Sequence, residues 1–236
     1  MSTLSDIMQE LESLGSEQQV KTYRRHGANG PMFGVKVGDL KKIVKKIKGE
    51  QSLALELWDT GNADAMYLAA LVADGSKMTT KQLDGWAKSA WWQMLSEYSV
   101  PWVASEHPQA FSIAKKWMTS KLAHVQSSGW NTYSDAVSTR PDSELDLAEI
   151  EALLEAVESK IGKVENRVKY VMNGFIISVG SYVKPMLSKA KASAKRIGAV
   201  EVNVGDTACK VPLATEYIAK VEKADRVGQK RKTAKC

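Results

Sequence analysis

Residues 86–102 read WAKSAWWQMLSEYSVPW and lie in the middle of a chain whose helical periodicity runs almost from end to end. The segment holds four of the chain's seven tryptophans together with Tyr98. Aromatic side chains at this density either fill the seams between packed helices or line a site that holds something flat and electron-poor. The rest of the sequence has to separate these two interpretations.

Outside this segment, helical periodicity predicts short helices separated by short breaks, and no convincing strand pattern occurs before residue 197. Helix pairs recur at a spacing of about 35 to 45 residues, as in HEAT-type repeats. The sequence therefore predicts an all-α fold, a curved solenoid of HEAT-like antiparallel helix pairs. The first predicted helix begins after Thr3 or Ser5 and ends at Gly15. The others cover residues 16–25, 40–47, 51–59, 62–73, 79–91, 93–105, 108–118, 121–138, 142–158, 163–183, 186–197 and 213–223.

The end of the chain differs from the rest. We expect a helical-repeat domain over residues 1–197 and a C-terminal extension over residues 198–236. Val200, Val202 and Val204 alternate briefly, which predicts a short extended segment near residues 200–204. After one short helix, the polar and basic terminus is expected to be flexible.

The composition is that of a globular chain with an excess of basic residues. The 236 residues are 44% apolar and 25% charged, with a formal net charge of +6. A basic surface favours polyanionic partners, with nucleic acid ahead of anionic membrane. No signal peptide is visible, and the longest apolar run, residues 168–183, is too short and too polar to span a membrane. We therefore expect a cytoplasmic protein that does not bind membranes.

The metal-binding residue types are sparse. The two cysteines, Cys209 and Cys236, and the three histidines do not have metal-ligand spacing, so we expect no metal site. No histidine lies near Cys209 in the sequence to activate it. Cys209 is therefore expected to be a small packed residue rather than a nucleophile.

Residues 40–48 combine an apolar face with a dense row of lysines. Leu40, Ile43, Val44 and Ile47 recur at helical spacing. Five lysines, of which Lys41, Lys45 and Lys48 lie opposite the apolar face, occur between residues 41 and 48 without an intervening acid. Such a row is either a solvated face or a set of phosphate contacts.

Two later helices have contrasting surfaces. Residues 142–158 hold seven acids and no basic residue, so this helix is expected to face away from any polyanion. The helix of residues 163–183 is strongly apolar and is expected to be central. Its polar side chains are expected to be paired or to point toward a groove, and they include Arg167, Lys169 and Asn173.

Several segments together resemble the DNA alkylation repair family, to which the AlkC- and AlkD-type alkylpurine DNA glycosylases belong. They are FGVKVGDLKKIVKKI, the ELW of the next helix, the Trp91–Trp92 pair, the later SSGW and the MNGFIISVGSYV helix. The order and spacing of these segments carry the resemblance over roughly residues 20–185. The resemblance implies a fold of HEAT-like repeats and double-stranded DNA, including alkylated DNA, as the partner.

In active members, the resemblance implies hydrolysis of the N-glycosidic bond of cationic N3- or N7-alkylated purines. A basic cleft would hold the backbone, aromatic faces would flank the lesion, and a carboxylate would stabilise the developing charge on the sugar. No metal or organic cofactor is required. The residues that match the catalytic segment, or could supply the charge, are Trp92, Ser96, Glu97 and Asp135.

This sequence departs from the active pattern of the family at three places. The active pattern W-W-D-x-x-D reads Trp91-Trp92-Gln93-Met94-Leu95-Ser96 here, so a serine replaces the carboxylate. An Arg-Arg pair is expected after Trp130, where this chain has Asn131 and Thr132. A further tryptophan of the cleft is replaced near Asn173 or Phe175. Loss of one electrostatic stabiliser commonly reduces the rate by about 10²–10³.

Three hypotheses follow. The chain is a DNA-binding member of this family with weak, altered or lost glycosylase chemistry, an active alkylpurine glycosylase that uses Glu97, Asp135 or another carboxylate, or a helical scaffold that binds another protein. The first two imply a basic, tryptophan-lined groove and a monomeric protein. The expected DNA contacts are Trp91, Trp130, Lys41, Lys45, Lys48, Arg167, Lys169 and Asn173. Trp58, Trp86, Trp102 and Trp117 are expected to fill seams between helices.

Overall fold

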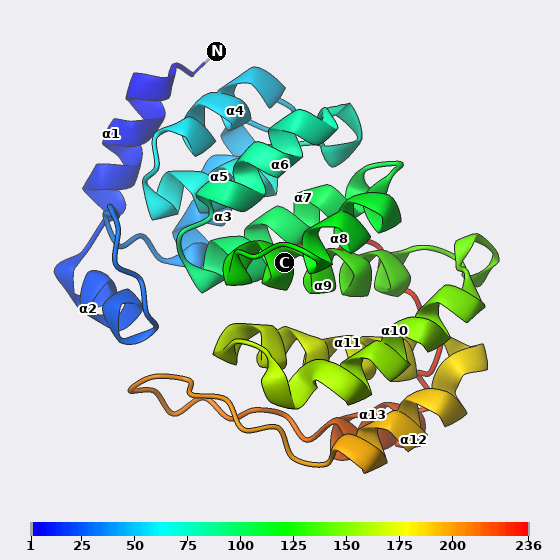
Figure 1. Ribbon diagram of the computed structural model, residues 1–236. Coiled ribbons are helices and arrows are strands. Elements are labelled where there is room, and N and C mark those ends of the chain that lie inside the picture. Colours follow the sequence, from blue (N-terminus) through cyan, green and yellow to red (C-terminus); the bar gives the residue numbers. More distant parts are fainter. Residues whose placement is uncertain (1, 236) are drawn as a thin grey trace. The chain divides into compact units, whose positions relative to one another are not determined.

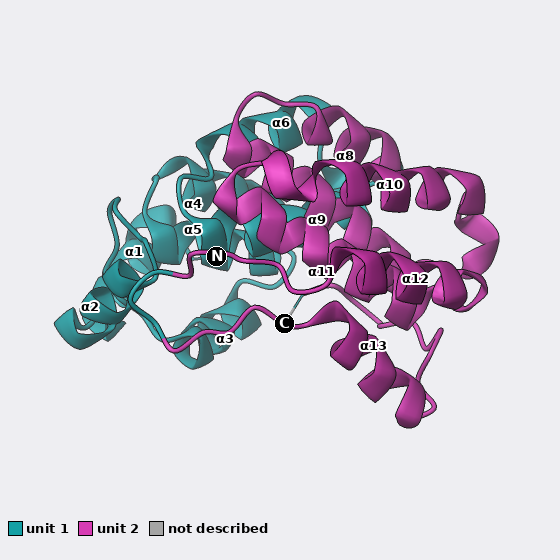
Figure 2. Ribbon diagram, turned by 60° about the horizontal axis from the view of Figure 1, so that its bottom comes forward, with its two compact units in different colours: residues 1–108, 205–207, 235 teal, residues 109–204, 208–234, 236 magenta. Residues whose placement is uncertain are grey.

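The computed structural model describes residues 2–235, and within that range it contains thirteen α-helices and no strand (Figure 1). The chain forms two compact units, which Figure 2 colours separately. Unit 1 holds the residues up to 108 together with 205–207 and 235, and unit 2 holds residues 109–204 and 208–234. The expected helical-repeat domain, residues 1–197, is thus divided near its middle.

Unit 1 is built from seven α-helices and a π-helical turn. The helices are α1 (Leu4–Leu14), α2 (Glu17–Arg25), α3 (Val37–Lys46), α4 (Gln51–Asp59), α5 (Ala63–Val72), α6 (Thr80–Ser89) and α7 (Val100–Glu106). The first six lie close to their predicted ranges, whereas α7 begins seven residues after the predicted start at residue 93 because a π-helical turn precedes it. Side chains of Thr3, Ser16, Asn62 and Thr79 cap the amino ends of α1, α2, α5 and α6. These caps satisfy backbone N–H groups that have no partner inside the helix.

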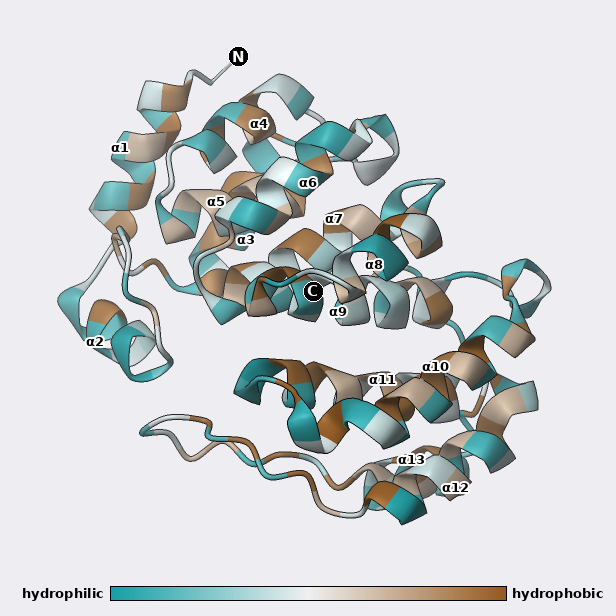
Figure 3. Cartoon of the chain, viewed as in Figure 1, coloured by the Kyte–Doolittle hydropathy of each residue, from teal (hydrophilic) through white to brown (hydrophobic). Residues whose placement is uncertain are grey.

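Helix α5 forms the centre of unit 1. All of its residues except Leu71 are buried, and it packs against α1, α3, α4 and α7. Its many alanines let the neighbouring helices approach closely, because each contributes only a methyl group to the interface. The hydropathy colouring in Figure 3 shows how the surrounding helices alternate between hydrophobic and hydrophilic residues.

A π-helical turn, Leu95–Ser99, directly precedes α7, whose first turn contains Pro101. Of the kink or the end that the sequence predicts at Pro101, the end does not occur, because the helix continues to Glu106. The N–H of Val100 donates to the carbonyl of Leu95, five residues earlier, which defines the wider turn. Proline has no N–H and its ring crowds the carbonyl four residues before it, so a wider turn upstream accommodates it.

Unit 2 contains six α-helices. They are α8 (Ala110–Met118), α9 (Ala123–Thr139), α10 (Leu147–Lys160), α11 (Asn166–Tyr182), α12 (Leu187–Ile197) and α13 (Ala214–Lys223). Helix α11 is mostly buried and packs against α9, α12 and α13, which confirms its predicted central position. Gly129 allows α8 and α9 to approach, because a Cβ there would lie 2.7 Å from the carbonyl oxygen of Ala114.

The C-terminal extension begins with an irregular loop and differs from expectation at Cys209. Residues 198–213 form no strand, and Asn166 holds the loop by exchanging two hydrogen bonds of 2.7 Å with the backbone of Asn203. Cys209 is exposed rather than packed, because this irregular segment has no core around it. Cys236 lies outside the described residues.

The basic end of the chain, expected to be flexible, makes specific contacts. In unit 2, Lys230 lies 2.8 Å from a carboxylate oxygen of Asp142, and the N–H of Arg231 donates to the carbonyl of Ser138 at 2.8 Å. In unit 1, Lys235 forms an ion pair of 3.0 Å with Glu106. These partners hold the last described residues against folded helices.

Candidate nucleic-acid interface

Helix α3 presents an exposed face of lysines. Four lysines lie in α3 and a fifth, Lys48, follows its end. Two of the five are paired with acids: Lys42 lies 2.7 Å from Asp39, and Lys46 lies 2.6 Å from Glu10. The other three, Lys41, Lys45 and Lys48, are exposed and have no acidic partner within residues 2–235. We call these three residues the lysine face. Its charge is available to a polyanion without breaking an existing ion pair.

The tryptophan pair is largely packed within unit 1. Trp92 is only 5% exposed, and its indole N–H donates to the carbonyl of His26 at 2.9 Å. The centroid of its ring lies 5.1 Å from the centroid of the Tyr23 ring. Trp91 is half-buried, donates to the carbonyl of Gly61 and covers the backbone of Gly30. Tertiary packing therefore covers most of the Trp92 ring, and DNA contact by Trp91 and Trp92 stays a prediction.

The other tryptophans of unit 1 confirm the packing prediction. Trp58 and Trp86 stack with ring centroids 4.0 Å apart, and Trp102 packs edge-on against Tyr67. Trp117 of unit 2 is also buried. The aromatic density of residues 86–102 thus mainly fills seams between helices.

The position of the expected catalytic carboxylate lies inside the π-helical turn. Ser96 is 2% exposed and its neighbour Glu97 is 1% exposed. The wider turn directs both side chains into the protein, although adjacent residues of a regular helix diverge by about 100°. Neither side chain therefore presents an exposed charge at the surface of unit 1.

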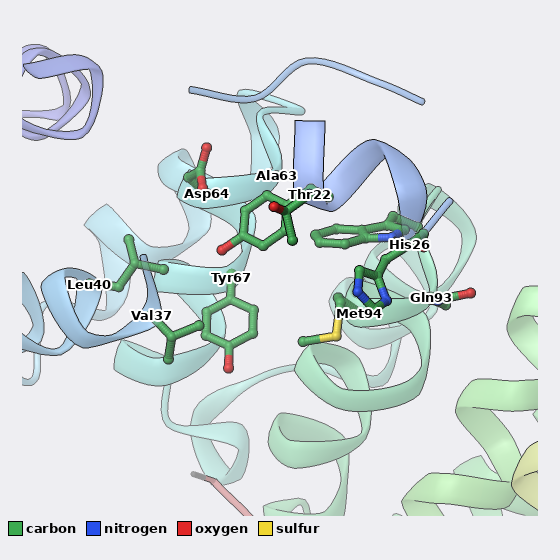
Figure 4. Close-up of a pocket in the computed structure, with 11 residues that line it drawn as sticks. Thr22, His26, Val37, Leu40, Ala63, Asp64, Tyr67, Gln93 and Met94 are labelled. Carbon is green, nitrogen blue, oxygen red and sulfur yellow. Dashed lines mark hydrogen bonds between the residues drawn. The ribbon is translucent and has the colours of Figure 1, made fainter. Parts of the chain in front are cut away.

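A pocket of about 200 Å³ opens beside Trp92 in unit 1 (Figure 4). Its floor consists of buried residues from α3, α5 and the turn at Trp92, and its rim consists of half-buried ones. The floor residues are Leu40, Ala63, Asp64, Tyr67 and Trp92, and the rim residues are Thr22, Tyr23, His26, Val37, Gln93 and Met94. Most of these residues were not singled out from the sequence.

Asp64 is the buried charge of this pocket. Its carboxylate accepts hydrogen bonds from the backbone N–H groups of Phe33, Gly34 and Val35 at 2.7, 2.9 and 3.0 Å. Burial raises the pKa of Asp64, and these three donors oppose the rise. Asp64 thereby fixes the loop between α2 and α3, which positions Tyr23 through the hydrogen bond that its hydroxyl donates to the carbonyl of Val35.

In unit 2, two of the expected DNA contacts are structural. Trp130 is buried with its ring centroid 5.3 Å from that of Phe175. Asn173 is buried and its amide donates to the carbonyl of Pro212 at 2.8 Å. Asn173 was expected to face DNA, but it holds the C-terminal extension on α11. Arg167 and Lys169 are half-buried, and the Arg167 guanidinium lies 4.4 Å from the centre of the Tyr170 ring.

Asp135 on α9 is a mostly buried carboxylate with 17% of its side chain exposed. Burial raises the pKa of Asp135 to about 7, and Arg231, whose guanidinium lies 3.9 Å away, opposes the rise. A carboxyl that is partly protonated at neutral pH is a poor source of fixed negative charge. This placement does not favour Asp135 as a substitute for the missing carboxylate.

The acids of residues 142–158 are largely neutralised within unit 2. Five of the seven form ion pairs with lysines or arginines, which reduces their repulsion of a polyanion. The pairs are Asp142 with Lys230, Glu144 with Arg140, Glu149 with Lys115, Glu151 with Lys189 and Glu158 with Arg196.

Neither a membrane-spanning helix nor a metal-binding cluster occurs within residues 2–235. No helix of the described chain has the length and apolar character needed to cross a bilayer. Within residues 2–235, no group of three or more histidine, cysteine or acidic side chains is arranged to hold a metal ion. The candidate interface consists of exposed lysines, an aromatic pocket and buried carboxyl groups.

Comparisons with known proteins agree on one relationship. A family model described as DNA alkylation repair enzyme matches residues 7–196. The protein Lin0241 of Listeria innocua is 36% identical, and Lmo0209 of Listeria monocytogenes is 35% identical. Each alignment covers 93% of this chain and 97% of the relative.

One solved structure is similar over its whole length. It is described as a new family of proteins related to the HEAT-like repeat DNA glycosylases with affinity for branched DNA structures. It is 38% identical, covers 100% of both chains and superposes with a TM-score of 0.91. The predicted all-α, HEAT-like fold is thereby confirmed.

Proposed function

Because the chain belongs to the DNA alkylation repair enzyme family, we propose that it is a DNA-binding protein that prefers branched DNA and does not excise alkylated bases. Binding would use phosphate contacts from the lysine face. The lysine face is the single observation that carries the binding proposal, since its three charges have no acidic partner in the described chain. Lysine contacts to phosphate are a major source of affinity for DNA.

The preference for branched DNA is supported by the relative whose structure is 38% identical and is described as having affinity for such structures. A similarity that covers both chains completely makes a shared binding mode the simplest expectation. Phosphate contacts alone position a protein on DNA but carry little information about its form. The preference therefore needs a second kind of contact.

The absence of base excision is supported by the environment of position 96. An oxocarbenium-like transition state needs a negative charge that lies next to the sugar. Ser96 cannot supply that charge, Glu97 is 1% exposed, and Asp135 has a pKa raised to about 7. A cationic alkylated base leaves readily, but this chain offers no exposed carboxylate at the matching position to assist its departure.

The test is release of N7-methylguanine and N3-methyladenine from methylated DNA, compared with a protein-free control. We expect no release above the control, together with DNA binding that weakens steeply as salt rises. Protein-dependent release would overturn the proposal in favour of an active glycosylase. A lack of salt-dependent DNA binding would instead favour a protein-binding scaffold.

A further inference from the structure

The pocket beside Trp92 has the lining of a site for a flat ligand. Three aromatic rings, those of Tyr23, Tyr67 and Trp92, border it, and the Met94 thioether lies at its rim. A volume of about 200 Å³ is somewhat larger than the apolar cavity of about 150 Å³ that holds one benzene molecule. Such a space suits one ring system rather than a whole nucleotide.

The rim of the pocket also carries a polar group without a partner. The His26 imidazole is half-buried and has no hydrogen-bond or ion-pair partner within the described chain. Its backbone carbonyl, by contrast, is held by the indole N–H of Trp92 at 2.9 Å. The backbone bond fixes the residue at the rim, where its ring nitrogens remain able to bond a ligand.

Phosphate-binding charge lies next to the same pocket. Val37 lines the rim from α3, and Lys41 follows it by one helical turn on the same side of the helix. Lys36, which precedes Val37, is exposed as well. A nucleotide whose base entered the pocket would therefore have its phosphate near lysines.

A base can enter such a pocket most easily where it is not paired. Extrusion of a stacked, paired base costs free energy, and that cost is lowest for a base that is already unpaired. Branch points of DNA supply such bases, whereas linear duplex does not. Stacking on aromatic side chains tolerates every base, because each base has a π face.

We propose that the pocket lined by Tyr23, Tyr67 and Trp92 binds a single unpaired nucleobase at a DNA branch point, with the His26 imidazole as its hydrogen-bonding partner. This inference rests on the proposed function and supplies the second kind of contact that a preference for branched DNA requires. Phosphate contacts at the lysine face attract any DNA, and the pocket distinguishes a branch from a duplex.

The experiment compares two three-way junctions that differ at one position. One carries an unpaired adenine at the branch point, and the other carries a tetrahydrofuran abasic residue there. Fluorescence anisotropy with the full chain should give about tenfold tighter binding to the adenine junction, the effect of stacking one base. The comparison uses unmutated protein, so no variant has to fold for the proposal to be tested.

Two variants assign the difference to the pocket. His26→Ala should reduce the adenine preference to less than about threefold and leave binding to the abasic junction unchanged. It keeps the backbone carbonyl that Trp92 requires. Gln18→Ala, an exposed residue of α2 that does not line the pocket, should retain the full preference.

The outcomes separate this inference from the proposed function. Equal binding to both junctions by the unmutated protein would overturn the pocket assignment while DNA binding stands. Binding to neither junction would overturn the proposed function, and the inference with it. A preference that survives in folded His26→Ala would remove His26 from the assignment.

Discussion

At the residue scale, the burial of Ser96 bears on whether a single substitution could restore base excision. Ser96 lies in the π-helical turn, 2% exposed and next to the buried Glu97. We expect Ser96→Asp to lower the free energy of unfolding by about 3 kcal/mol, because it buries a second carboxylate beside the first. Denaturant unfolding measures this change.

The matched control is Ser96→Ala, which removes the hydroxyl without adding charge and should cost about 1 kcal/mol. We also expect no release of N7-methylguanine by Ser96→Asp, since the added carboxylate would not reach the surface. Release of the base by this variant would contradict the placement of position 96 and favour a recently lost glycosylase.

Asp135 gives a pH-dependent prediction. Burial raises its pKa from an ordinary value of 3.8 to about 7, so the folded state binds the proton more tightly than the unfolded state. Its contribution to stability therefore falls as pH rises from about 4 to about 7 and is constant above that range. Asp135→Asn should stabilise the protein by about 2–4 kcal/mol at pH 8 and by little at pH 4. Equal effects at both pH values would contradict this.

At the scale of an element, the lysines of α3 and the adjoining Lys48 form two groups, one paired with acids and one unpaired. Lys41, Lys45 and Lys48 have no acidic partner among the described residues, whereas Lys42 and Lys46 are paired with Asp39 and Glu10. Changing the first three to glutamine should reduce the slope of log affinity against log salt by about 2 to 3. Anisotropy titrations on a linear duplex at several salt concentrations measure that slope.

The matched control on the same helix changes Lys42 and Lys46 to glutamine. Because these lysines are already neutralised, the slope should fall by less than about 1. If this double variant lowered the slope as much as the triple variant does, the lysine face would not be the phosphate-binding surface.

Close contact between α8 and α9 depends on Gly129. A Cβ at this position would lie 2.7 Å from both the Ala114 carbonyl oxygen and the Met118 nitrogen. Gly129→Ala should therefore destabilise the protein by about 2 kcal/mol. Gly174→Ala in α11, where a Cβ meets nothing within 4 Å, should stabilise it by about 0.5–1 kcal/mol. Thermal unfolding of the two variants checks the difference, and a stabilising Gly129→Ala would contradict the packing.

The helices were predictable because their signals are local. Thr3, Ser16, Asn62 and Thr79 mark amino ends by their own side chains, and periodic apolar residues mark the buried faces. The π-helical turn before Pro101 was not predictable. It arises from a compromise between the proline and the packing of α7, and that packing cannot be read from periodicity.

The candidate site was predictable only in part. The lysine face was visible as a run of charge, but the burial of Trp92 depends on Tyr23 and His26, which lie far away in the sequence. Asp64 was missed because an acid in the first turn of a helix is ordinary. One signal could have revealed it: the helix ADAMYLAALV has no polar face to accommodate an exposed acid.

At the scale of the whole molecule, the basic balance and the family relationship point to the same partner. The net charge is +6, and most acids of residues 142–158 are paired within unit 2. Charge of this kind raises affinity for every form of DNA. Only a contact that a linear duplex cannot make would give a preference for one form.

The most direct measurement is a competition in which a labelled three-way junction is displaced by unlabelled junction or by linear duplex of the same arm sequences. At equal nucleotide concentration and fixed salt, the junction should compete about tenfold better than the duplex, the effect of one additional stacked base. Equal competition by the two DNA forms would contradict a preference for branched DNA.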